Sequence, residues 1–130
     1  MIQDAQIRNT TIIAIVDDDE SIRTALESLL RSSGYKVRTY CSALEFLSGN
    51  SPAEIHCLIS DIQMPGMSGV EMHEKLVAKG FHIPTIFITA YLGMAPHVGA
   101  DTPTLVACLQ KPCDANRLLS CIDTALGQRH

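Results

Sequence analysis

Three carboxylates, one ammonium group and one hydroxyl stand at the ends of short apolar runs in this 130-residue sequence. The residues are Asp17, Asp18, Asp61, Lys111 and Thr89. Carboxylates held together repel one another, at about 4 kcal/mol for a pair 4 Å apart at an effective dielectric of 20. A divalent cation removes this cost, and carboxylate oxygens suit Mg²⁺, which keeps several of its waters. No histidine or cysteine stands at these ends, so the pattern does not favour zinc.

The ammonium and the hydroxyl suit an anion beside such a metal. Lys111 would supply a mobile positive charge for a phosphoryl oxygen or a carboxylate, and Thr89 would supply a hydrogen-bond donor. Carboxylate, Mg²⁺, ammonium and hydroxyl together are the parts needed to transfer a phosphoryl group to an aspartate nucleophile. The residue types therefore predict phosphoryl chemistry, provided that the fold brings them together.

Five short segments rich in β-branched and other apolar residues predict five strands. They are residues 12–16, 36–40, 57–60, 84–89 and 104–110. The second alternates apolar and polar side chains, which is typical of a strand near the edge of a sheet.

Apolar residues at helical spacing predict helices between these strands, at residues 22–30, 42–47, 68–79 and 114–126. The predicted N-caps are Asp19, Ser42, Ser68 and Asp114, and the third helix is expected to turn Met72, Leu76 and Val77 inward. Strands alternating with helices predict a parallel sheet with right-handed crossovers and helices on both faces. Functional groups in such a sheet gather at the carboxyl ends of its strands.

The segment between Ala90 and Pro103 breaks the alternation where a further helix would fall. It contains two glycines and two prolines. In a helix interior each proline costs about 3 kcal/mol and each glycine about 1 kcal/mol relative to alanine. The composition predicts a short, irregular or mobile element in place of a regular fourth helix.

The composition limits which classes of protein this sequence can belong to. A chain of 130 residues with 46% hydrophobic and 18% charged residues predicts one globular domain. The formal charge of −4 argues against a broad nucleic-acid-binding face. No signal peptide and no run of about 20 apolar residues is present, so the expected location is the cytoplasm. The five cysteines form no Cys-x-x-Cys pair and are expected to be reduced, packed thiols.

Four segments resemble the receiver domain of two-component response regulators. They read IVDDD at 15–19, ISDIQMPGMSG at 59–69, ITA at 88–90 and QKP at 110–112. The residues around Asp17, Ser42 and Asp61 are most similar to receivers that precede a LuxR-type DNA-binding domain. The resemblance covers residues 11–127 and leaves 1–10 and 128–130 as tails. It implies an α/β, flavodoxin-like (βα)5 three-layer sandwich whose five-stranded parallel sheet has the order 2-1-3-4-5.

The resemblance also implies a role for each polar residue. Asp61 would accept a phosphoryl group from a histidine kinase or another phosphohistidine donor. Asp18 and Asp61 would bind Mg²⁺ through their side chains and Gln63 through its backbone carbonyl, with Asp17 acting directly or through water. Thr89 would bond a phosphoryl oxygen and Lys111 would pair with it. The Lys111–Pro112 bond is expected to be cis, and Gln63 and Tyr91 occupy the positions that tune phosphoryl lifetime.

The sequence departs from the family at one position of the usual switch. Family members carry an aromatic residue three positions before the lysine, where this chain has Cys108.

The expected partners are a sensor histidine kinase or phosphotransfer protein, and the resemblance leaves room for a C-terminal DNA-binding domain and a weak homodimer. Neither direct nucleic-acid binding nor membrane association is expected of this domain.

Two other function classes stay open from the sequence. One is a receiver-like module that binds proteins without phosphorylation: the complete set of acids, threonine and lysine argues against it, while the missing aromatic residue and the Gly/Pro-rich segment keep it open. The other is an Mg²⁺-dependent aspartyl phosphatase, although such enzymes favour an Asp-x-Asp motif and a cap over the substrate. The leading interpretation is a signalling module that catalyses only its own phosphorylation and dephosphorylation.

Overall fold

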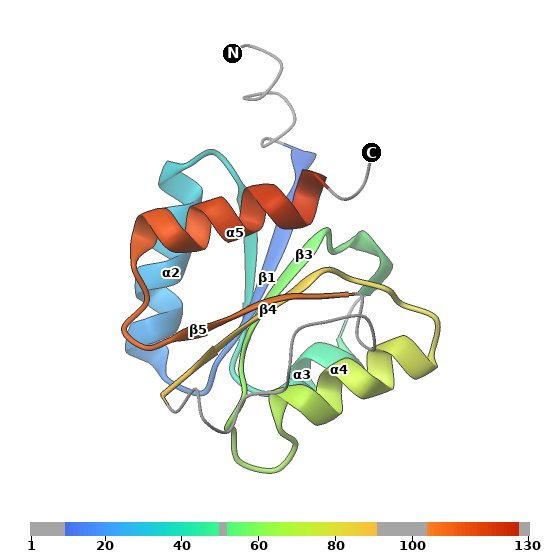
Figure 1. The fold of residues 1–130 in the computed structure, drawn as a ribbon. Helices are drawn as coiled ribbons and strands as arrows, with labels where there is room; N and C mark the ends of the chain where they lie inside the picture. The colour runs from blue at the N-terminus through green and yellow to red at the C-terminus, as the bar shows by residue number, and fades with distance from the viewer. Residues whose placement is uncertain (1–9, 50–51, 91–103, 128–130) are drawn as a thin grey trace.

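A five-stranded parallel sheet forms the centre of the protein in the computed structural model, which describes residues 10–49, 52–90 and 104–127. The strands are β1 (Ile12–Val16), β2 (Lys36–Tyr40), β3 (Cys57–Asp61), β4 (Thr85–Thr89) and β5 (Leu105–Gln110). Their order is β2-β1-β3-β4-β5, as the resemblance implied (Figure 1). Apart from Ile12, every residue of the three central strands is buried, because helices cover both faces of the sheet.

Two pairs of helices cover the two faces of the sheet (Figure 1). Helices α2 (Glu20–Ser32) and α5 (Ala115–Gly127) pack on one face through Leu30 and Ile122, among others. Helices α3 (Ala43–Ser48) and α4 (Gly69–Ala78) pack on the other through Phe46, Met72 and their neighbours. A short 3₁₀ turn, η1 (Pro52–Glu54), precedes β3.

The helices begin at the polar residues that the sequence predicted as caps. The Asp19 carboxylate accepts from the N–H groups of Ser21 and Ile22, and the Ser42 hydroxyl accepts from Glu45. Ser68 forms a capping box with Glu71, and Asp114 accepts from the N–H of Arg117 at the start of α5. Each cap satisfies a backbone donor that a helix N-terminus leaves without an intrahelical acceptor.

One packing prediction is wrong and several expectations lie outside the described residues. Val77 is 37% exposed because Leu76 takes the inward position, and the next residue is turned about 100° further round the helix. The predicted irregular element at 90–103 lies outside the described residues apart from Ala90, and so do most of the tails at 1–10 and 128–130.

The expectation of packed thiols is wrong for Cys41, which is exposed, and His82 is exposed as well. All five cysteines are free, and Cys57 is fully buried in the sheet. His73 is buried in α4 and hydrogen-bonds through Nε2 to the Thr104 hydroxyl at 2.7 Å. The ring of His56 accepts from the N–H of Ile12 at 3.0 Å. Within the described part of the chain, no helix has the length and apolar character that crossing a membrane requires.

Candidate functional site

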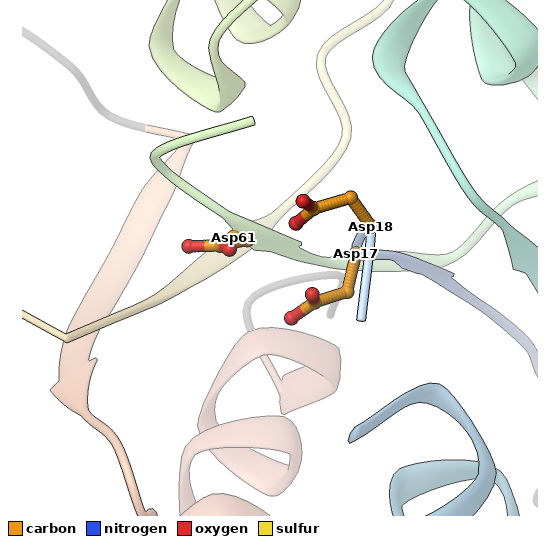
Figure 2. Close-up of side chains that lie close together, drawn as sticks. All are labelled: Asp17, Asp18 and Asp61. Carbon is orange, nitrogen blue, oxygen red and sulfur yellow. The ribbon is translucent and has the colours of Figure 1, made fainter. Parts of the chain in front are cut away.

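Three carboxylates meet at the carboxyl edge of the sheet. Asp17 and Asp18 follow β1, and Asp61 ends β3, the strand that pairs with β1 through Val16 and Ser60. One oxygen from each carboxylate lies within 4.8 Å of the others, and Figure 2 shows the three side chains gathered at these strand ends. The structure therefore brings together the acids that the sequence singled out.

Lys111 joins two of these acids. Its Nζ lies 3.1 Å from Asp61 Oδ2 and 3.2 Å from Asp17 Oδ2. The Lys111–Pro112 bond is cis, as the resemblance implied, and the Lys111 N–H donates to the carbonyl of Thr89 at 2.8 Å. Partial burial alone would lower the pKa of Lys111, but the hydrogen bonds to Asp61 and Asp17 outweigh it, so its pKa lies above 10.5. The ammonium group therefore stays charged between the two carboxylates.

Asp17 is held through all of its polar groups. Its N–H donates to the carbonyl of Tyr40, and its own carbonyl accepts from Arg23 Nη1 at 2.7 Å. Its Oδ1 accepts from the N–H of Asp19 at 2.9 Å, while Oδ2 faces Lys111. The residue is only 2% exposed, and burial raises the pKa of its carboxyl above 3.8 because the hydrogen bonds from Asp19 and Lys111 offset only part of the desolvation.

Replacing the Asp17 carboxylate with a neutral amide is expected to stabilise the metal-free protein. Since folding raises the pKa of Asp17, its ionised form costs the folded state free energy at neutral pH, and this cost disappears as the pH falls through the folded pKa towards 3.8. In Mg²⁺-free buffer, Asp17→Asn should therefore have the higher free energy of unfolding at neutral pH, with the difference shrinking in acid. Urea unfolding at a series of pH values measures this, and a variant less stable than the parent at neutral pH would contradict it.

Asp61 is fixed by the loop that follows it. The carboxylate Oδ1 accepts from the N–H of Gln63 at 3.3 Å, and Oδ2 accepts from Lys111. The residue is 6% exposed, so the side chain is largely covered while one edge reaches solvent. This arrangement leaves the carboxylate oriented by two donors from different parts of the chain.

Gly69 is a site-positioning residue that the sequence prediction did not single out. It is the first residue of α4, its N–H donates to the carbonyl of Ile62 at 2.8 Å, and it lies against the end of β3. A Cβ at this position would be 2.2 Å from the carbonyl oxygen of Asp61 and 2.9 Å from Ser60 Oγ. The sequence does carry a signal for this contact: a glycine directly follows the Ser68 cap, although most other residues form helices more readily.

Thr89 reaches the same edge of the sheet at the end of β4. It is 1% exposed, and the strand register pairs Asp61 with Ile88, the residue before it. Gln63 has an exposed side chain in the loop after Asp61, while Tyr91 lies outside the described residues. Of the predicted site residues that the structure describes, all therefore lie at this one edge.

The position of the family's switch aromatic residue has a thiol in this chain. Cys108 lies in β5 opposite Phe87 of β4 and is partly buried against Phe87, Ile62 and Leu105. The Phe87 ring is 1% exposed and makes an edge contact with the His73 ring, with centroids 6.0 Å apart. The aromatic side chain of this part of the core is thus on the neighbouring strand.

The acid cluster fits a magnesium ion by its chemistry. Its members offer carboxylate oxygens close enough together to share one cation, and no histidine or cysteine belongs to this group of described residues. Hard oxygen ligands with room for waters are what Mg²⁺ prefers. Asp18 is exposed, so part of the coordination sphere would face solvent.

Comparison with known proteins agrees with this geometry. A family model described as the response regulator receiver domain matches residues 13–123. The chain is 39% identical to response regulator protein TmoT of Ectopseudomonas mendocina, over 89% of this chain and 53% of TmoT. It is 33% identical to transcriptional regulatory protein FixJ of Azorhizobium caulinodans, over 89% of this chain and 55% of FixJ. The chain thus spans about half the length of these relatives.

Solved structures show the same fold. Response regulator StyR superposes with a TM-score of 0.83 at 40% identity, over 92% of this chain and 60% of StyR. TrrA from Thermotoga maritima, in complex with Mg(2+)-BeF, superposes with a TM-score of 0.74 at 28% identity, over 89% of this chain and 99% of TrrA. With the family match and the acid cluster at the sheet edge, these likenesses show that the chain belongs to the receiver domains of response regulators.

Proposed function

We propose that Asp61 of this receiver domain accepts a phosphoryl group from a sensor histidine kinase or phosphotransfer protein. The observation that carries the proposal is the Asp61 carboxylate held between two further acids and the Lys111 ammonium group. In the proposed reaction an Asp61 oxygen forms a bond to phosphorus while the bond from phosphorus to the donor's imidazole nitrogen breaks. That nitrogen keeps the electron pair, and the product is an aspartyl phosphate.

The proposed metal ligands are the side chains of Asp18 and Asp61 and the backbone carbonyl of Gln63, with Asp17 binding directly or through water. When bound, Mg²⁺ would supply positive charge to the phosphoryl oxygens during transfer. Lys111 would pair with a phosphoryl oxygen, since its ammonium group already bridges Asp61 and Asp17. Thr89 would donate its hydroxyl to another oxygen, and its burial at the end of β4 supports this role.

The output of the phosphorylated domain would be a conformational change. We infer that this change is read by a DNA-binding domain of a longer protein, because FixJ, a transcriptional regulatory protein, is about twice the matched length. A cytoplasmic location and a weak homodimer fit the same function. As a signalling module, the domain would catalyse only its own phosphorylation and dephosphorylation.

Mass spectrometry of the intact protein tests the proposal. The chain is incubated with acetyl phosphate and Mg²⁺, or with acetyl phosphate and EDTA, and a single phosphoryl adduct is expected only with Mg²⁺. Absence of an adduct with acetyl phosphate and with a phosphorylated kinase domain would favour a protein-binding module that no longer uses phosphorylation. Sustained release of phosphate from added phosphomonoesters would instead favour an aspartyl phosphatase.

A further inference from the structure

Arg23 makes a contact with the acid cluster that involves the backbone. It lies in the first turns of α2, and its Nη1 donates to the carbonyl oxygen of Asp17 at 2.7 Å in a partly buried hydrogen bond. A guanidinium bonded to a carbonyl is a charge-assisted hydrogen bond, which is shorter and stronger than one between neutral groups. This contact therefore fixes the peptide unit between Asp17 and Asp18.

The orientation of that peptide unit determines where the Asp18 carboxylate lies. The carboxylate of Asp17 is held independently, by the Asp19 N–H and by Lys111. Asp18 is exposed, and its oxygen lies within 4.8 Å of oxygens of Asp17 and Asp61. Without a cation these like charges repel, so a free peptide unit would let the Asp18 side chain turn towards solvent.

The charge of Arg23 and its hydrogen bond act on a bound cation in opposite directions. A positive guanidinium near the cluster repels a divalent cation, so loss of the charge alone would strengthen cation binding. Loss of the hydrogen bond would weaken cation binding, because the Asp18 carboxylate would have to be ordered when the ion binds. The sign of the change in affinity therefore separates the two effects.

We propose that Arg23 is a positioning residue for the divalent cation, holding the Asp17–Asp18 peptide unit so that the Asp18 carboxylate faces Asp61. The proposal rests on the metal site of the proposed function. It assigns a role to a residue of α2 that is not one of the clustered acids, Thr89 or Lys111. It requires that the gain from positioning the Asp18 carboxylate exceed the repulsion between the guanidinium and the ion.

Calorimetric titration with Mg²⁺ tests the proposal, using the parent chain, Arg23→Met and Arg23→Lys. Methionine keeps the aliphatic packing of the side chain and removes its donors, and Mg²⁺ affinity is expected to fall roughly 10-fold, the size seen for partners of metal ligands. Lysine keeps the charge with a less rigid donor, so its affinity should lie between those of the parent and the methionine variant. Equal or tighter Mg²⁺ binding by Arg23→Met would overturn the proposal.

The matched control is Arg31→Met on the same helix. Arg31 makes an exposed ion pair with Glu27, and its replacement by methionine removes the same charge as Arg23→Met does. The Mg²⁺ affinity of Arg31→Met should therefore equal that of the parent. An equal loss in both methionine variants would overturn the positioning role. If Arg23→Met does not fold, Arg23→Lys decides, because parent-like affinity contradicts the proposal and weaker affinity supports it.

Failure of this inference is distinguishable from failure of the proposed function. The phosphoryl adduct that the parent forms with acetyl phosphate reports on the proposed function, whereas the Mg²⁺ affinities of the arginine variants report on the role of Arg23. If the parent forms no adduct while the Mg²⁺ affinities differ as described, the proposed function fails and the role of Arg23 stands. If the parent forms the adduct while Arg23→Met and Arg31→Met bind Mg²⁺ equally, the inference fails alone.

Discussion

Asp61→Asn should form no phosphoryl adduct with acetyl phosphate and Mg²⁺. An asparagine side chain has nearly the same shape but lacks the anionic oxygen that would attack phosphorus. The fold should persist, because Lys111 keeps Asp17 as a partner at 3.2 Å and the substitution removes one of three clustered negative charges. Intact-mass spectra of parent and variant, recorded under the same conditions, give the result.

The matched control is Asp19→Asn, an acid two residues from Asp17. Its carboxylate caps α2 by accepting from Ser21 and Ile22, and asparagine is an equally good N-cap. It is not one of the three clustered acids, so Asp19→Asn should form the adduct as the parent does. A parent-like adduct in Asp61→Asn, or its loss in Asp19→Asn, would place the phosphoacceptor elsewhere.

Gly69→Ala is expected to destabilise the fold and disturb the site together. The added Cβ would lie 2.2 Å from the carbonyl oxygen of Asp61, which is backbone and cannot turn aside as a flexible side chain would. Either α4 or the end of β3 must move, and overpacking of this kind costs about 1–3 kcal/mol. Denaturant unfolding should show that loss, and the Mg²⁺-dependent adduct should form more slowly because Asp61 is displaced.

Gly127→Ala provides the comparison for this substitution. Gly127 is the last residue of α5, and a Cβ there would meet no heavy atom of the described residues within 4 Å, apart from its chain neighbours and the backbone of its own helix. The same chemical change should therefore leave both the free energy of unfolding and the rate of adduct formation near those of the parent. If Gly69→Ala unfolds at the same denaturant concentration as Gly127→Ala, the close approach between α4 and β3 does not constrain the site.

Local patterns in the sequence are enough to predict the sheet and the edge of the sheet at which the candidate site lies. β-Branched runs such as residues 12–16 have a clear strand preference, and the acids after them are neighbours because β1 pairs with β3. Capping is equally local, so Asp19 and Ser68 could be assigned from the residues that follow them. These features depend on a few adjacent residues, which is why they could be read directly.

Contacts that depend on the backbone of distant elements could not be predicted in the same way. Arg23 donates a hydrogen bond to a backbone carbonyl group, which every residue carries. The residue types in the sequence therefore do not indicate which residue Arg23 contacts. The close packing of Gly69 on Asp61 depends on how α4 meets β3, and sequence spacing does not give that distance. Val77 is apolar and follows Leu76, which predicts an inward position, but one step along a helix turns a side chain away from the core.

Locating the phosphoryl group on the chain shows which aspartate is the phosphoacceptor. The parent is phosphorylated with acetyl phosphate and Mg²⁺, the acyl phosphate is reduced with borohydride, and the peptides are sequenced by mass spectrometry. Reduction converts a phosphorylated aspartate to homoserine, so homoserine is expected at position 61 and unmodified aspartate at positions 17 and 18. Homoserine at either of those positions, with unmodified Asp61, would contradict it.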